Sequence, residues 1–200
     1  MIISTRTSDE RKVQLVAYTI ILYISSLFVP FVIVASIHSM FYENHQKYWF
    51  FETPPSAYLA FMAGMVLAAV VITIYLVSAF KGAESKKRVS ILSLLIFCVP
   101  IFIGAVDNYY YATDSGIFYN KLLGFGESEY KWSEMEEVKL VYRHSNGSIK
   151  LDGYTFVSKS GEEIALSYSS KLAGIQWRIN EKIEQYKMNV TDNYDDPIMD

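Results

Sequence analysis

Apolar residues form long unbroken stretches in the first half of the chain and short alternating ones in the second half. Residues 13–37, 57–80 and 89–106 contain no Asp, Glu, Lys or Arg. Each stretch has about 18 residues or more, the length with which a helix crosses a hydrocarbon core of roughly 30 Å. The pattern predicts a membrane region of three spanning helices over residues 13–106, preceded by a polar segment at residues 1–12.

Two prolines interrupt the predicted helices. Pro30 lies in the first stretch and Pro100 lies in the third. Proline removes one backbone hydrogen bond, and a membrane helix tolerates this loss with a kink. The first stretch is also longer than the roughly 7–15 residues of a signal-peptide core. We therefore expect an uncleaved, kinked anchor rather than a signal peptide.

Basic residues predict the orientation of the spans. The short loop at residues 81–88 and the polar N-terminus are rich in Lys and Arg, whereas the loop at residues 38–56 contains Lys47 alone. Short loops rich in Lys and Arg stay on the cytoplasmic side. We expect a multi-pass protein of the cell membrane, with a cytoplasmic N-terminus and an extracellular C-terminal domain. The residues that define this topological loop, and that could also hold anionic lipid headgroups, are Lys81, Lys86, Lys87 and Arg88.

The loop at residues 38–56 has two candidate roles. Its aromatic side chains are Phe41, Tyr42, Tyr48, Trp49, Phe50 and Phe51. Aromatic rings settle at the headgroup boundary of a membrane, so we expect this loop to lie there. His38, Glu43 and His45 are types of residue that bind metals, but nothing in the sequence fixes a coordination geometry for them. A solvated loop is the better interpretation.

Small residues and the absence of charge distinguish the spans. Ala60 and Gly64 lie one turn apart, a spacing that lets two helices approach closely, so this face is expected to pack against another span. The three stretches contain no charged side chain, whereas pumps and transporters usually need one for a proton or ion relay. The spans therefore argue against a transporter.

The second half of the chain has the composition of a separate, soluble body. Residues 107–200 hold 10 basic and 16 acidic side chains, a net charge of −6, against 8 basic and 5 acidic side chains in residues 1–106. Short runs of aromatic and β-branched residues, separated by turns, predict about seven strands from residue 109 onward. Asn146 and Gly147 predict a type I′ hairpin within them.

A helix is predicted to close this body. Ser170 is a suitable N-cap, and apolar residues recur after it at steps of three or four positions. The stripe consists of Leu172, Ile175, Ile179, Ile183 and Tyr186. Such a stripe needs a sheet or the mouth of a barrel to cover. The soluble domain then extends over residues 107–188, and the acidic tail at residues 189–200 is predicted to be disordered.

Three segments have a characteristic order of turns and strands. Residues 113–120 begin with Thr-Asp-Ser-Gly, residues 130–138 read Tyr-Lys-Trp-Ser-Glu-Met-Glu-Glu-Val, and Tyr-Thr-Phe at 154–156 precedes Ser160-Gly161. This order resembles the bacterial PH (pleckstrin-homology-like) domains found on small membrane proteins. The resemblance implies a membrane protein of the α+β class, with three transmembrane α-helices followed by a PH-like antiparallel β-barrel or sandwich with one C-terminal helix.

Eukaryotic relatives of this family bind phosphoinositides in a basic pocket near the first two strands. The corresponding region here offers Lys121 and Lys131 beside Glu127 and Glu129, and the domain as a whole is acidic. A negative field repels phosphate groups, so phosphate binding is not carried over to this chain. The resemblance implies an architecture and no specific activity.

Candidate chemistry is sparse. Cys98 is the only cysteine, so no intrachain disulfide or cysteine-based metal site is expected. His144 is the only histidine of the soluble half and has no cysteine or clear aspartate partner. We expect no catalytic residue, metal site or cofactor, and no enzyme activity. Large side chains that form the predicted core, of which one or two could line a partner groove, are Trp132, Tyr142, Tyr154, Phe156 and Trp177.

The sequence favours a membrane-anchored PH-like domain that acts as a binding or scaffolding module in a bacterial cell envelope, since an external domain without cysteine is typical of bacterial surfaces. The expected partners are the lipid bilayer and another membrane or envelope protein, and not nucleic acid. The partner would add at an open sheet edge or beside the closing helix. One alternative is a small regulator or immunity-type protein that acts through its transmembrane helices, and a less favoured one is a membrane enzyme. The sequence does not predict an oligomeric state.

Overall fold

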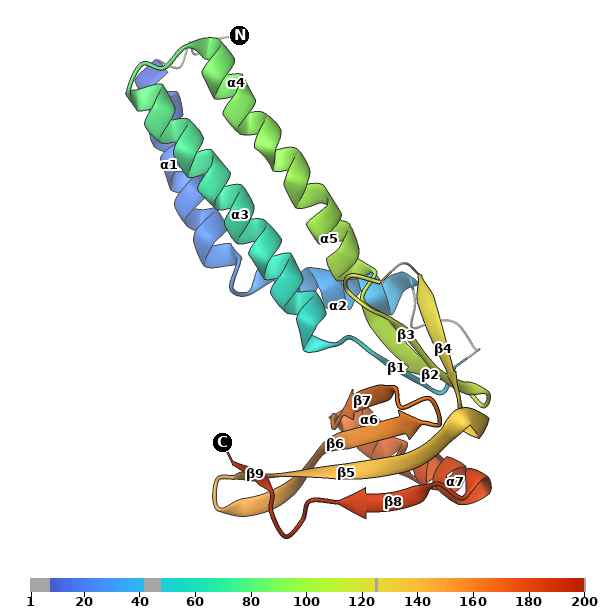
Figure 1. Ribbon diagram of the computed structural model, residues 1–200. Coiled ribbons are helices and arrows are strands. Elements are labelled where there is room, and N and C mark those ends of the chain that lie inside the picture. The colour runs from blue at the N-terminus through green and yellow to red at the C-terminus, as the bar shows by residue number, and fades with distance from the viewer. Residues whose placement is uncertain (1–7, 42–47, 125, 200) are drawn as a thin grey trace. The chain divides into compact units, whose positions relative to one another are not determined.

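The structure, a computed structural model, describes residues 8–41, 48–124 and 126–199 (Figure 1). The chain divides into two compact units. Residues 1–44 and 55–108 make up the helical unit, and residues 45–54 and 109–200 make up the strand unit. The strand unit therefore takes a segment from between two helices, which the expected domain at residues 107–188 did not include.

The helical unit has two helices that are each long and apolar enough to cross a membrane. The first is α3, Pro55–Phe80. The second runs over Ser85–Val106 and consists of α4 (Ser85–Ser93), the 3-10 helix η1 (Leu94–Phe97) and α5 (Cys98–Val106). The 3-10 turn lies just before Pro100, whose missing N–H disturbs the regular hydrogen bonding of the turn before it. These two helices coincide with the second and third predicted stretches.

The first predicted stretch forms a bent pair of helices. α1 spans Ser8–Ser25 and α2 spans Val29–Phe41, and their axes differ by 65°. Pro30 is the second residue of α2, where its missing N–H costs no helical hydrogen bond. The predicted kink near Pro30 is confirmed, but one continuous helix over residues 13–37 is not formed. The unit therefore has two candidate spans, or three if the bent pair counts as one.

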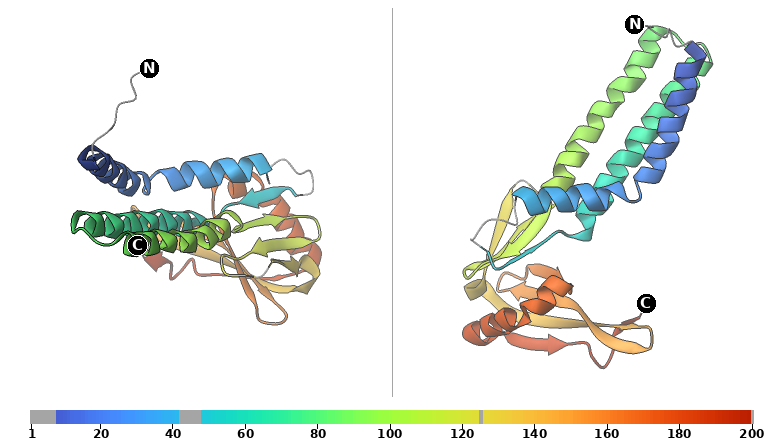
Figure 2. Two further views of the ribbon diagram at one scale, coloured as in Figure 1. Left: turned by 90° about the horizontal axis from the view of Figure 1, so that it is seen from above. Right: turned by 180° about the vertical axis from the view of Figure 1, so that it is seen from behind.

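α3 packs against α5 at a small residue. A Cβ atom placed on Gly64 would lie 2.7 Å from the ring of Phe102, and the centroid of the Phe61 ring lies 4.8 Å from that of Phe102. The close approach predicted for this face is confirmed at Gly64. Nε2 of His38 lies 2.6 Å from the carbonyl oxygen of Val106, which accepts its hydrogen bond and joins α2 to the end of α5. Figure 2 shows the start of α1 and the α3–α4 turn at the same end of this unit.

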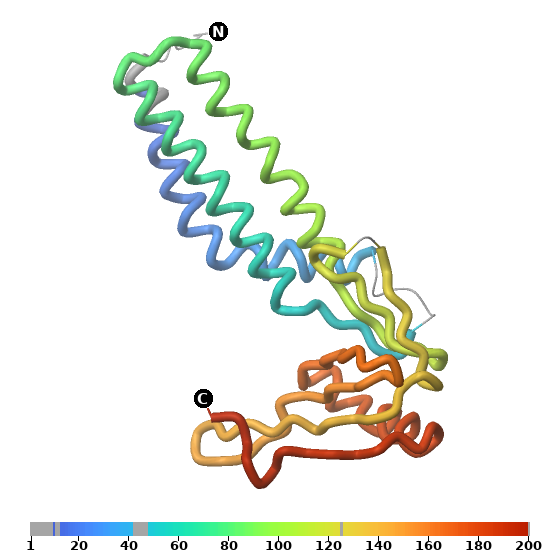
Figure 3. Tube along the Cα trace, in the orientation of Figure 1, coloured from blue at the N-terminus to red at the C-terminus, as the bar shows by residue number. Residues whose placement is uncertain are grey.

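The strand unit contains two sheets. The first is antiparallel with the order β1-β2-β3-β4. Its strands are β1 (Phe50–Glu52), β2 (Tyr109–Ala112), β3 (Gly116–Asn120) and β4 (Glu127–Lys131). β1 pairs with β2, with Phe50 opposite Ala112 and Glu52 opposite Tyr110. The Cα trace in Figure 3 runs on from β1 into α3.

The position of β1 corrects the expectation for residues 38–56. A solvated loop at the headgroup boundary was expected, but Phe50 and Phe51 are buried and Phe50 belongs to the core of the strand unit. Backbone hydrogen bonds to β2 together with burial of the Phe50 ring outweigh the attraction of an aromatic side chain for the membrane interface. Tyr42, Glu43 and His45 lie outside the described residues.

The second sheet has the order β7-β6-β5-β8, with β9 also pairing with β5. β5 (Met135–Ser145) and β6 (Ser148–Ser158) form a long hairpin, and β7 (Glu163–Ser167) continues the sheet. Asn146 and Gly147 have φ angles of 51° and 76°, so the predicted two-residue hairpin with positive φ at both positions is confirmed. In the described part of the chain the sheets do not close into a barrel. Of the barrel and sandwich alternatives, the closed barrel is therefore not observed.

The C-terminal tail is ordered. β8 (Asn189–Asp192) and β9 (Ile198–Met199) run parallel to β5. The side chain of Asn193 accepts a hydrogen bond from the Tyr142 N–H over 2.6 Å and donates one to the Tyr142 carbonyl over 3.1 Å. The predicted disorder of residues 189–200 is wrong for these strands, because the edge of β5 offers backbone partners that even an acidic segment can use.

The closing helix forms in two pieces, α6 (Ser170–Gly174) and α7 (Gln176–Tyr186). The N-cap is Ser169 rather than Ser170, since the Ser169 hydroxyl accepts a hydrogen bond from the Leu172 N–H over 3.2 Å. The predicted apolar stripe covers the core as expected. Leu172, Ile179 and Ile183 are buried in the core cluster, and Ile175 and Tyr186 pack against it.

Candidate functional site

The five side chains proposed for a partner groove do not share one surface. Trp132, Tyr154 and Phe156 are fully buried in the core of the strand unit. Tyr142 is half-buried on β5, where its ring packs edge-on against Tyr194 with centroids 5.1 Å apart. Trp177 alone is exposed, at 60 % of its surface. The candidate surface is therefore reduced to the region around Trp177.

Arg178 links Trp177 to a second tryptophan. The centre of the Arg178 guanidinium lies 5.0 Å from the centroid of the Trp177 ring and 5.7 Å from that of Trp49. Both distances are within the roughly 6 Å of a cation–π interaction. Trp49 in turn stacks on the buried Trp132, with centroids 6.3 Å apart and planes at 12°. We call Trp49, Trp177 and Arg178 the tryptophan–arginine cluster.

Two segments that are far apart in the sequence build this cluster. α7 supplies Trp177 and Arg178 in its first turn, and the segment that leads into β1 supplies Trp49. The Trp49 backbone is fixed by a hydrogen bond from its N–H to the Ala112 carbonyl over 3.1 Å. A second tie is made by Ser169, whose hydroxyl donates to the Glu52 carboxylate over 2.7 Å. The first hydrogen bond therefore joins the Trp49 segment to β2, and the second joins β1 to the N-cap of α6.

The cluster contains polar hydrogens that no described residue accepts. The guanidinium of Arg178 makes no hydrogen bond or ion pair within the described ranges. The indole Nε1 of Trp49 is buried and has no acceptor there either. A buried donor without a partner costs about 1–3 kcal/mol. The site is thus organised by ring stacking, while its hydrogen-bonding capacity is unused.

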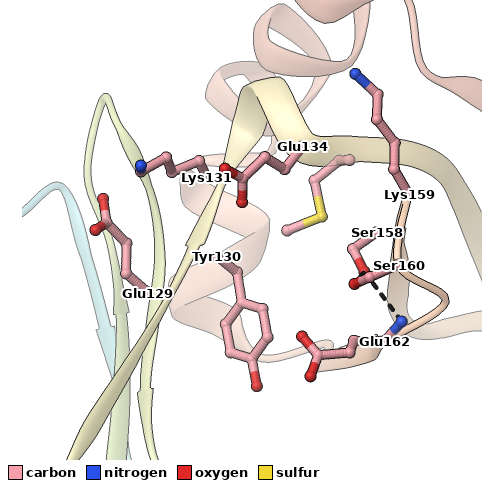
Figure 4. Close-up of a pocket in the computed structure, with 9 residues that line it drawn as sticks. Glu129, Tyr130, Lys131, Glu134, Ser158, Lys159, Ser160 and Glu162 are labelled. Atoms are coloured by element: carbon pink, nitrogen blue, oxygen red, sulfur yellow. Dashed lines mark hydrogen bonds between the residues drawn. The ribbon is translucent and has the colours of Figure 1, made fainter.

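A small pocket lies elsewhere on the strand unit (Figure 4). It holds about 200 Å³ between β4, the 3-10 helix η2 (Trp132–Glu134) and the β6–β7 turn. Both acidic and basic side chains line it, among them Glu129, Glu134, Glu162, Lys131 and Lys159. Its volume is below the roughly 300–1,000 Å³ of sites that bind small molecules. Two of its polar groups are also engaged, since Lys159 donates to the Ser133 carbonyl over 3.0 Å and Ser158 accepts from the Glu162 N–H over 3.0 Å.

The two lysines compared with a phosphoinositide pocket have different neighbours. Nζ of Lys121 lies over the rings of Tyr119 and Tyr130, at 6.0 and 5.7 Å from their centroids, and its hydrogen bond to Tyr130 raises the pKa of the amine. Lys131 lines the small pocket with Glu129 and Glu134. No group of three His, Cys, Asp or Glu side chains able to hold a metal occurs among the residues that the structure describes.

The topological loop is at the α3–α4 turn. Lys81, Lys86 and Lys87 are exposed, and Arg88 is half-buried in the first turn of α4. Cys98 is buried within the helical unit. His144 is a half-buried residue of β5. It lies opposite Ile149 of β6 and Met199 of β9 in the sheet.

Alkaline pH is expected to destabilise the strand unit through its tyrosines. Burial raises the pKa of four phenols above the usual value of 10, and a hydrogen bond to Glu127 adds to the effect at one of them; they are Tyr110, Tyr111, Tyr119 and Tyr154. A raised pKa in the folded state stabilises the protein fully below the unfolded value, and this contribution is lost as the pH rises through the folded value. The free energy of unfolding should therefore fall above pH about 10.

The tyrosinate absorbance of the full chain, followed together with protease resistance, measures this effect. We expect some of the 16 tyrosines to stay protonated until the strand unit unfolds. Complete tyrosine ionisation near pH 10 in a protein that still resists protease would contradict it.

The chain matches no protein-family model and no curated protein. Its function is therefore argued from its own residues.

Proposed function

We propose that this chain is an integral membrane protein with three spans, whose strand unit is a PH-like binding module on the outer surface of a bacterial cell. The module would bind another membrane or envelope protein, and the spans would hold it at the bilayer. No catalytic step is part of the proposal.

The observation that carries the proposal is the pairing of β1 with β2. Phe50–Glu52 and Tyr110–Ala112 form one antiparallel ladder, so both segments must lie on the same side of a bilayer. The chain between them contains α3 and the helix over Ser85–Val106, the two helices able to cross on their own. An even number of crossings between β1 and β2 is what the pairing requires, and two helices supply it. The bent pair α1–α2 would make the third span.

Charge supports the orientation. The α3–α4 turn, with Lys81, Lys86, Lys87 and Arg88, lies at the end of the helical unit where α1 begins. Short basic loops stay in the cytoplasm. β1 and the rest of the strand unit are separated from this turn by one span each, so they would face outward.

The strand count supports the PH-like assignment. β1 brings the strands that precede the closing helix to seven, β1 to β7. Seven strands in two sheets followed by an amphipathic helix are the architecture that the resemblance implies. The extra strands β8 and β9 lie at the edge of β5, after the helix.

A second candidate function places the contact in the membrane helices. The helix over Ser85–Val106 buries a smaller share of its residues than α3 does, so more of its apolar surface is available to lipid or to another membrane protein. Such surface suits a small regulator or immunity-type protein.

Thiol labelling in intact cells tests the topology. In a Cys98→Ser background, we expect Leu123→Cys, which replaces the side chain with 92 % of its surface exposed, to react with a membrane-impermeant maleimide from outside. Lys86→Cys should react only after permeabilisation. The reverse labelling pattern would contradict the proposed orientation.

Photo-crosslinking separates the two candidate functions. A benzophenone amino acid at Leu123 probes the strand unit, and one at Ile96 probes the membrane helix; both side chains are exposed. Protein adducts at Leu123 without adducts at Ile96 support the binding module. The opposite result would favour action through the spans.

A further inference from the structure

We infer that the tryptophan–arginine cluster is the docking point for a carboxylate that stands beside an apolar side chain in a segment of a partner protein. The inference rests on the proposed function, since it names the chemistry of the partner that the strand unit would bind. Its basis is the geometry of Trp49, Trp177 and Arg178.

The guanidinium of Arg178 is preorganised to bind an anion. Its guanidinium lies within 6 Å of the centroids of both the Trp177 and the Trp49 ring, and stacking of this kind fixes the plane of the group. The five N–H donors of arginine form a rigid fork that matches a carboxylate with two parallel hydrogen bonds. Because the side chain is already ordered, binding an anion would cost little further conformational entropy.

Several other basic side chains of the strand unit already have a partner. Lys139 pairs with Glu163 at 3.1 Å, Arg143 with Asp152 at 3.1 Å and Lys182 with Asp114 at 3.6 Å. Lys159 donates to a backbone carbonyl. Arg178 differs from these because its donors have no acceptor in the described part of the chain. An anion from another molecule would satisfy these donors.

Trp177 supplies the apolar half of the site. With 60 % of its surface exposed, this ring leaves a large apolar area next to the guanidinium. Trp and Arg are the residue types that dominate the binding energy of protein interfaces. The combination therefore fits an acidic residue next to an aromatic or aliphatic one.

The negative charge of the domain favours a protein segment over a polyanion as the ligand of this cluster. Residues 107–200 carry a net charge of −6, which repels anionic polymers and anionic membranes. Recognition of phosphate groups also uses clusters of arginines, whereas Arg178 is the one arginine of this cluster. A single carboxylate with an apolar neighbour uses both halves of the site without demanding more positive charge.

Fluorine NMR of the full chain in nanodiscs of neutral phosphatidylcholine tests the inference. 5-Fluorotryptophan gives one resonance for each of the three tryptophans, with buried Trp132 as internal reference. The probes are N-acetyl-phenylalanine and N-acetyl-phenylalaninamide, which differ only in the carboxylate. We expect N-acetyl-phenylalanine to shift the Trp177 and Trp49 resonances and to bind about tenfold more tightly than the amide.

Two matched variants separate the effect of the planar Arg178 guanidinium from the effect of its positive charge. Arg178→Lys keeps the charge but loses the planar fork, and it should reduce the difference in affinity between the two probes. Arg143→Lys changes an arginine that is already paired with Asp152, and it should leave the probe response unchanged. Equal shifts with acid and amide, or an unchanged response in Arg178→Lys, would overturn the inference.

Anionic lipid provides the competing outcome. If phosphatidylglycerol in the nanodisc shifts the Trp177 resonance without any probe, the anion comes from the membrane and a protein carboxylate is the wrong assignment. If neither probe binds but Leu123 still gives protein adducts, the tryptophan–arginine cluster is not the docking site, and the proposal of a binding module stands. Probe binding without any protein adduct from Leu123 would instead count against the binding module.

Discussion

Replacing Trp132 with alanine is expected to unfold the strand unit at denaturant concentrations that the native protein withstands. The side chain is fully buried, its Nε1 donates to the Thr113 carbonyl over 2.9 Å, and its ring packs edge-on against Phe156 with centroids 5.5 Å apart. Removing a buried tryptophan costs about 3–5 kcal/mol. The total stability of a domain is about 5–15 kcal/mol, so the loss is a large share of it.

Pulse proteolysis of the full chain in urea, read at cleavage sites within the strand unit, measures this loss. Trp177→Ala is the matched control, since it removes the same side chain from an exposed position and should change the free energy of unfolding by no more than about 0.5 kcal/mol. Equal urea midpoints for Trp132→Ala and Trp177→Ala would show that Trp132 is not part of the core.

Features set by neighbouring residues could be predicted from the sequence. The hairpin at Asn146 and Gly147 depends on two residues that accept positive φ, and the closing helix depends on the spacing of apolar residues from Leu172 to Tyr186. The break before Pro30 follows from the preference of proline for the first turn of a helix, where its missing N–H costs no hydrogen bond. These signals lie within a few positions of the structure that they predict.

Features set by distant partners could not be predicted in this way. β1 has three residues, too few to show the alternation of a strand, and its partner β2 follows only after two long helices. β8 is polar and acidic, and it is ordered by the edge of β5 and by the two hydrogen bonds between Asn193 and Tyr142. Composition alone therefore indicated disorder where the fold supplies a partner.

The candidate site was only partly visible in the sequence. Trp177 belonged to the large side chains considered for a groove, but nothing local distinguished it from Trp132, which is buried. Trp49 was assigned to the membrane interface because the loop around it is aromatic. Its position beside Arg178 depends on the pairing of β1 with β2 and on the tie between Glu52 and Ser169.

Gly116→Ala is expected to destabilise the strand unit by about 3 kcal/mol, at the upper end of the usual range for overpacking. A Cβ atom at this position would overlap the Tyr130 carbonyl oxygen and would lie 2.9 Å from the Tyr130 carbonyl carbon. Both atoms belong to the backbone of β4, which is hydrogen-bonded to β3 and cannot rotate away as a side chain would. The sheet must therefore shift, and the β3–β4 ladder with it.

Gly174→Ala separates this backbone clash from a general loss of glycine. Gly174 ends α6, and a Cβ atom there meets no atom within 4 Å. Alanine should keep or raise stability there, by up to about 1 kcal/mol, because it restricts the unfolded chain. Gly153→Ala provides the parallel case in the second sheet, where the Cβ atom would lie 2.5 Å from the Leu166 carbonyl oxygen. If pulse proteolysis gave Gly116→Ala the stability of Gly174→Ala, the β3–β4 register with Gly116 opposite Lys131 would have to be wrong.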